Sequence, residues 1–99
     1  MTIKLVNRGA EGELLLEGRL DTATASEADG IFAEVAQRFD RVILNLNGLQ
    51  YISSAGLRLL LHLQQTMRKK NGELILTHVN KTVMEVLEMT GFAGLLQFR

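Results

Sequence analysis

A nearly continuous apolar run, Val42-Ile43-Leu44-Asn45-Leu46, constrains the fold more than any other feature of the chain. Such a run is typical of a β-strand that is covered on both faces, as strands in parallel sheets are. Apolar residues recur at helical spacing before this run, and a leucine-rich stretch follows it after Gly48. We therefore expect a central strand that has a helix before it and another after it in the sequence.

The rest of the chain continues this alternation. Strands are predicted over residues 2–8, 13–20, 73–78 and, briefly, 95–98, with a turn over residues 9–12 that closes an opening hairpin. Strands that alternate with helices favour a parallel sheet with right-handed crossovers. The predicted class is α/β, with a mostly parallel central sheet of four to five strands and helices packed against it.

Three helices are predicted from their end signals. The first begins at the capping-box pattern Thr24-Ala25-Ser26-Glu27 and ends near Arg38, the second runs from Ser53 and Ser54 to Asn71-Gly72, and the third runs from Asn80 to Gly91. The first helix carries an apolar stripe at helical spacing, formed by Ala28, Ile31, Phe32, Val35 and Phe39. Met84, Met89, Phe92 and Leu95, near the end of the chain, are assigned mainly to packing.

Charge and cysteine content narrow the classes of function. Eleven basic side chains balance eleven acidic ones, which argues against direct binding of nucleic acid or an anionic membrane. The chain has no cysteine, and no apolar segment approaches the roughly 20 residues that cross a bilayer. We expect one domain over residues 1–99, located in the cytoplasm.

Two loops lie where a strand is predicted to lead into a helix, residues 18–24 and 47–56. Sites in α/β sheets tend to lie at these carboxyl ends. In the second loop, Ser53 and Ser54 stand at a helix start, where free amides and the helix dipole stabilise a phosphate. A serine there can equally be a simple cap, and Ser53 in that role would leave Ser54 facing outward. Gly56 either opens an approach to the serine or allows close packing of helix on sheet.

Five segments together resemble the STAS domain of anti-sigma factor antagonists, over nearly the whole chain. They are Ile52-Ser53-Ser54-Ala55-Gly56-Leu57, Gly18-Arg19-Leu20-Asp21, Leu44-Asn45-Leu46, Asn71-Gly72-Glu73-Leu74 and Leu87-Glu88-Met89-Thr90-Gly91-Phe92. The resemblance implies a STAS-type fold. It also implies a protein that, when unphosphorylated, binds an anti-sigma factor serine kinase and so releases a sigma factor.

By position in the family motif, Ser54 is the serine that the kinase phosphorylates and that a serine phosphatase of the partner-switching type restores. The resemblance places partner binding at Asp21, Thr22, Ser53, Ala55, Gly56 and Arg58. One departure stands out, because Ser53 occupies the place of the family's usual acid, which leaves Asp21 as the acidic residue expected nearest the site. The alternative is a constitutive STAS scaffold of a transporter or signalling complex that is never phosphorylated.

Other chemistry finds less support in the sequence. Arg58 and His62 follow Ser54 at four-residue intervals, so Arg58 is either a phosphate contact or part of a solvated helix face with Gln65 and Lys69. His62 and His78 are too far apart for a local metal motif, and no nucleophile elbow or phosphate-binding glycine loop occurs. We therefore expect no enzyme, no catalytic residue, no metal and no cofactor.

Overall fold

The computed structural model describes residues 1–99 and contains one four-stranded sheet in the order β1-β2-β3-β4. The elements are β1 (Thr2–Arg8), β2 (Glu11–Leu20), α1 (Thr22–Arg38), β3 (Arg41–Ile52), α2 (Ser54–Lys69), β4 (Glu73–Thr77), α3 (Lys81–Met89) and the 3-10 helix η1 (Phe92–Leu95). β1 runs antiparallel to β2, whereas β2, β3 and β4 are mutually parallel. The predicted α/β class with a mostly parallel sheet is confirmed.

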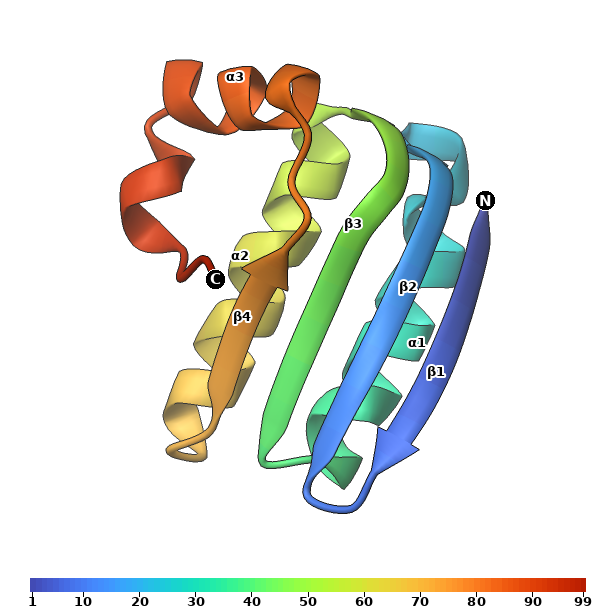
Figure 1. Cartoon of the computed structure of the whole chain (residues 1–99), viewed down its shortest axis with the longest axis vertical. Helices are drawn as coiled ribbons and strands as arrows, with labels where there is room; N and C mark the ends of the chain where they lie inside the picture. The colour runs from blue at the N-terminus through green and yellow to red at the C-terminus, as the bar shows by residue number, and fades with distance from the viewer.

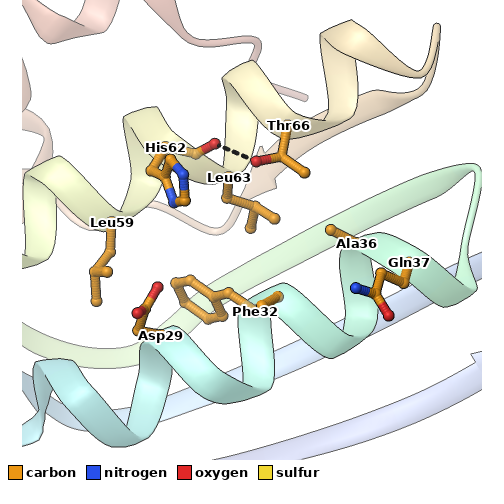
Figure 2. Close-up of a pocket in the computed structure, with 9 residues that line it drawn as sticks. Asp29, Phe32, Ala36, Gln37, Leu59, His62, Leu63 and Thr66 are labelled. Carbon is orange, nitrogen blue, oxygen red and sulfur yellow. Dashed lines mark hydrogen bonds between the residues drawn. The ribbon is translucent and has the colours of Figure 1, made fainter.

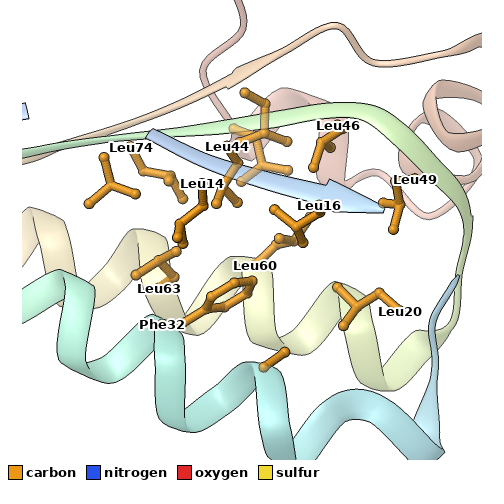
Figure 3. Packing of buried hydrophobic residues seen from close by; sticks show 14 of the residues in the cluster. Leu14, Leu16, Leu20, Phe32, Leu44, Leu46, Leu49, Leu60, Leu63 and Leu74 are labelled. Carbon is orange, nitrogen blue, oxygen red and sulfur yellow. The ribbon is translucent and has the colours of Figure 1, made fainter. Parts of the chain in front are cut away.

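Two helices cover one face of the sheet. In Figure 1, α1 and α2 both lie behind the strands, while α3 lies across the end where β3 and β4 finish. The core fills the space between this face and the helices, and the predicted apolar stripe of α1 contributes to it. Figure 3 shows its centre, where Leu14, Leu16, Leu44 and Leu46 from the strands meet Phe32, Leu60 and Leu63 from the helices.

The opposite face of the sheet is protected by polar side chains. Alternation along the strands places Ile43 and Ile75 on this face, and both are buried although they lie outside the main core. Arg41 lies on the same face between two acids, 3.6 Å from Glu11 and 2.9 Å from Glu73. The central strand is therefore buried on both sides, as expected, but helices cover only one of them.

The last predicted strand is wrong. Residues 92–95 instead form η1, which follows Gly91 in the left-handed conformation at φ 79°. Only Phe98 makes a bridge, in parallel to Leu76. The left-handed turn at Gly91 and the helical turn of η1 use most of the residues that an extended strand would need. The remaining segment therefore forms only one bridged pair with β4. The sheet therefore has four strands and one added bridge.

The helix α3 buries only one side. Val83 and Leu87 are fully buried, but Met89 in its last turn is 86% exposed and Leu95 in η1 is 56% exposed. The assignment of these two residues to packing is therefore wrong, because Met89 lies on the side of α3 opposite its buried residues and Leu95 lies at the exposed end of η1. Phe92 does pack against the core, and Met84 is half-buried.

Candidate functional site at the carboxyl ends of the strands

The loop after β2 is shorter than the sequence predicted, because Asp21 caps α1. Its Oδ1 atom accepts hydrogen bonds from the amides of Ala23 and Thr24, at 3.0 and 3.1 Å. The Thr24 hydroxyl in turn accepts from the Asp21 amide at 3.0 Å, which completes a capping box. The box predicted at Thr24 and Glu27 is thus wrong by three residues, since an aspartate and a threonine at the same spacing satisfy the free amides first.

These hydrogen bonds determine the charge state of Asp21. The Thr24 amide, which donates to the carboxylate, has the largest effect and lowers the pKa of Asp21 below its ordinary value of 3.8. Asp21 therefore carries its negative charge throughout the neutral range. The charge is directed at the start of α1, while the following residue, Thr22, is exposed in the first turn.

The loop after β3 gives its two serines different roles. Ser53 is the cap of α2, and its Oγ accepts a hydrogen bond from the Gly56 amide at 3.3 Å. Ser54 is the first residue of the helix and is exposed, whereas Ala55 behind it is half-buried. The prediction that Ser53 caps and Ser54 faces outward is confirmed.

Gly56 fixes how closely α2 approaches the sheet. It is buried, and a Cβ atom added to it would lie 2.8 Å from Leu20 Cγ, from the Leu20 carbonyl oxygen and from Ile52 Cγ1. The Ser53 amide also donates to the Leu20 carbonyl, at 2.9 Å. The glycine is thus explained by close packing, the second of the two explanations that the sequence offered. The same contacts hold the loop containing Ser54 against the loop containing Asp21.

The surroundings of Ser54 suit an anion. The first turn of α2 holds no acidic residue, and neither do the first turns of α1 and α3, which begin at the same end of the sheet. Amides and aligned peptide dipoles at a helix start favour negative charge. A phosphate on Ser54 would therefore meet no acid within its own helix start.

Sequence reasoning missed a pair of side chains beside this loop. Arg19 and Tyr51 face each other across β2 and β3, and the guanidinium carbon lies 4.2 Å from the centre of the tyrosine ring. Arg19 Nε also lies 3.6 Å from Asp21 Oδ2. The signal available in the sequence was only that Arg19 lies within the segment ending at Asp21 and that Tyr51 directly precedes the segment that contains Ser54.

The family model described as STAS domain matches residues 4–99, which is nearly the whole chain. The chain belongs to the STAS domain family. A protein named as an anti-sigma factor antagonist, BtrV of Bordetella bronchiseptica, is 37% identical in an alignment 99 positions long, which covers 94% of this chain and 83% of BtrV. The anti-sigma F factor antagonist of Paenibacillus polymyxa is 32% identical over 78 residues, 77% of this chain and 67% of that protein.

A solved structure confirms the fold of this STAS domain. The anti-sigma factor antagonist SpoIIAA in its unphosphorylated form superimposes with a TM-score of 0.78 over 99% of this chain and 87% of SpoIIAA. The two sequences are 17% identical, so the superposition concerns the fold. The mostly parallel sheet with its helices is thus the STAS-type fold that the resemblance implied.

The polar side of α2 in this STAS domain is a solvated helix face, with one qualification. Arg58, Gln65 and Lys69 are exposed, and Arg58 makes no side-chain hydrogen bond to Ser54. His62 is exposed too, but it lines a groove of about 200 Å³ between α1 and α2. Figure 2 shows its ring directed toward Asp29 and Phe32 of α1. His62 therefore belongs to this groove and not to the surroundings of Ser54.

The structure contains neither a metal-binding cluster nor a helix suited to cross a membrane. No three histidine, aspartate or glutamate side chains lie together in an arrangement that would hold a metal ion. No helix is both long and apolar enough to cross a bilayer.

Proposed function

We propose that this STAS domain is an anti-sigma factor antagonist whose partner binding is switched by phosphate on Ser54. The observation that carries the proposal is the division of roles between the two serines. The hydroxyl of Ser53 holds the start of α2 and the hydroxyl of Ser54 is exposed one residue further on. A kinase can therefore modify Ser54 without removing the cap of the helix.

The charge of a phosphate gives the switch its physical basis. A phosphoserine adds about 1.5 to 2 negative charges at neutral pH, and the start of α2 stabilises such a charge by on the order of 1 kcal/mol. The fold tolerates the modification for this reason. A partner packed against the neutral serine would have to desolvate the same charge, so phosphorylation weakens binding.

The names of the relatives support an anti-sigma factor as the partner, and we propose that this partner is a serine kinase. The unphosphorylated domain binds an anti-sigma factor serine kinase through Asp21, Thr22, Ser53, Ala55 and Arg58, with Gly56 holding the surface in place from below. Binding releases a sigma factor for transcription in a bacterial cytoplasm, and a partner-switching serine phosphatase resets Ser54. The domain acts as a binding module and catalyses no reaction.

Phosphopeptide mapping tests the modified residue. The domain is incubated with ATP and a serine-kinase anti-sigma factor isolated by its binding to the domain, and the products are mapped by mass spectrometry. We expect one phosphate, on Ser54, and none after replacement by Ser54→Ala. Phosphate on Ser53 alone would contradict the assignment of the switch to Ser54. No phosphate on either serine would favour the alternative, a constitutive scaffold.

Binding of matched variants tests the switch itself. Ser54→Ala should bind the anti-sigma factor as the unphosphorylated wild type does, whereas Ser54→Asp should bind at least about tenfold more weakly because its charge must be desolvated. Isothermal titration calorimetry measures both. Equal affinities of the two variants would show that charge at this position does not exclude the partner.

A further inference from the structure

The pair formed by Arg19 and Tyr51 occupies the edge of the surface proposed to bind the partner. Arg19 is separated from Asp21 only by Leu20, whose carbonyl accepts from the Ser53 amide at 2.9 Å. Tyr51 lies two residues before Ser53 on the neighbouring strand. Leu20 and Ile52 are buried in the core, so alternation along the strands places Arg19 and Tyr51 on the opposite face of the sheet, at the end where α2 begins.

A local irregularity in the sheet brings these two side chains together. Gly18 pairs with Leu49, but Arg19 pairs with Tyr51, so Gln50 is left over at this point of the ladder. Gly18 has a φ of +102°, a left-handed backbone conformation that favours glycine. Bulges of this kind redirect a side chain, and here the result is a guanidinium stacked on an aromatic ring.

Arg19 is held in place by contacts that leave its hydrogen-bonding edge available. Stacking on Tyr51 involves the flat face of the guanidinium, so the N–H groups still point along its plane. The approach to Asp21 Oδ2, at 3.6 Å, is longer than a hydrogen bond. The side chain of Arg19 is also 59% exposed. A held guanidinium with free donors is suited to bind a carboxylate through two parallel hydrogen bonds.

The charges around Ser54 indicate the sign of the charge that a partner's surface should carry. Within residues 18–24 and 47–58, which form the two loops and the first residues of α2, Asp21 is the only acid, and its charge is directed at the amides of α1. Arg19 and Arg58 are the two cations there, and both are exposed. Although the whole chain has no net charge, this surface is cationic, so a complementary partner presents carboxylates.

We infer that Arg19, stacked on Tyr51 and paired with Asp21, determines partner specificity by binding a carboxylate of the anti-sigma factor next to Ser54. The inference rests on the proposed function and adds to it the chemistry of the partner's surface. It also distinguishes Arg19 from Arg58, which has no stacking partner and no acid to hold it.

A charge reversal with a matched control tests the inference. Arg38 is the control because it also lies over an aromatic ring, 5.2 Å from the centre of Phe39, and pairs with an acid, Glu34, at 3.9 Å. It stands in the last turn of α1, at the other end of the sheet. Titration with the anti-sigma factor should show binding at least about tenfold weaker for Arg19→Glu and within about twofold of wild type for Arg38→Glu.

Two further variants support the reading of this titration. Arg19→Gln keeps the site neutral in case Arg19→Glu unfolds, and it should weaken binding several-fold and lower the salt dependence of the association rate. Replacing one surface carboxylate of the anti-sigma factor by arginine should restore binding to Arg19→Glu. Failure of every such replacement to restore it would contradict the inference.

The remaining outcomes separate this inference from the proposed function. If both Arg19 variants bind like wild type while Ser54→Asp does not, the inference is wrong and the proposed function stands. If the Arg19 variants change only the affinity of the phosphorylated domain for the anti-sigma factor, Arg19 contacts the phosphate of its own chain and the inference is again wrong. If wild type binds no anti-sigma factor at all, both fail.

Discussion

The two ends of the parallel strands are built differently. At the amino end, charged side chains pair within the chain, because Arg41 lies between Glu11 and Glu73. Lys70 also lies at this end and donates to the carbonyls of Ala36 and Phe39, at 2.8 and 3.1 Å. At the carboxyl end, Asp21, Ser53 and Asn80 each cap a helix with a short side chain.

This difference shows why one end is suited to a partner and the other to the fold. Long charged side chains at the amino end are engaged with each other and with the last turn of α1. Short capping side chains at the carboxyl end accept hydrogen bonds from the free backbone amides of the helices. Ser54 and Arg19 remain exposed there. A phosphate or a partner can therefore act at the carboxyl end without breaking a contact that holds the domain together.

The largest expected effect comes from filling the close contact below Ser54. Gly56→Ala should lower the free energy of unfolding by about 1–3 kcal/mol, because the new methyl group meets Leu20 and Ile52 at 2.8 Å. Gly30→Ala is the matched control in the middle of α1, where a Cβ meets nothing within 4 Å, and it should raise the free energy of unfolding by about 0.5–1 kcal/mol. Urea unfolding measures both, and equal shifts would mean that α2 does not depend on this contact.

Removal of one cap at each end should have similar effects on stability but different effects on function. Ser53→Ala removes the bond to the Gly56 amide, and Lys70→Met removes the bonds to the end of α1, each costing about 1 kcal/mol. Only Ser53→Ala should change the rate at which Ser54 is phosphorylated, because only this cap positions the serine. Urea unfolding and a kinase assay check the two parts, and a Lys70→Met variant with an altered phosphorylation rate would contradict the division between the ends.

The charge of Asp21 makes part of the domain's stability depend on pH. Because the pKa of Asp21 is lowered in the fold, its stabilising contribution is complete above the unfolded value of 3.8 and is lost as the pH falls through the folded value. The difference in unfolding free energy between wild type and Asp21→Asn should therefore be greatest at neutral pH and shrink in acid. Urea unfolding over a pH series measures it, and a difference that grows in acid would reverse the sign of the argument.

The smallest effect is expected at the ion pairs of the amino end. Arg41→Gln should change the unfolding free energy less than Ser53→Ala does, since exposed ion pairs contribute little and are screened by salt. The hydrogen bond from Arg41 to Glu73 raises the pKa of the guanidinium, so no change of its charge is expected in the neutral range. Thermal unfolding at low and high salt measures the effect. A loss of unfolding free energy larger than that caused by Ser53→Ala would show that the amino end contributes more to stability than the cap of α2.

Local patterns predicted the parts of this molecule that depend on neighbouring residues in the chain. The spacing of Ala28, Phe32 and Val35 identified the buried side of α1, and the serine pair identified the start of α2. The cap of α1 was misplaced because Asp21 and Thr24 form the same kind of pair as Thr24 and Glu27. The predicted end of β2 at Leu20 is correct and leaves Asp21 directly at the start of α1, so the choice of Asp21 was within reach of the sequence.

Contacts between strands were beyond the reach of the sequence. The pairing of Arg19 with Tyr51 depends on a register that changes at Gly18, and no local pattern contains this information. The exposure of Met89, by contrast, follows from its place on the side of α3 opposite Val83 and Leu87. The motif around Ser54 was found because it is contiguous, while Arg19 comes from the neighbouring strand β2.

The bridge at Phe98 bears on how this domain behaves at high concentration. The Leu76 amide donates to the Gln97 carbonyl, and the Arg99 amide donates to the Leu76 carbonyl, so three residues cover part of the outer edge of β4, whose three middle residues are apolar. An apolar strand with an unshielded edge is a template on which further chains can add. The short segment over residues 97–99 thus occupies edge groups of β4 that another strand would otherwise pair with, and any tag joined there should leave these hydrogen bonds intact.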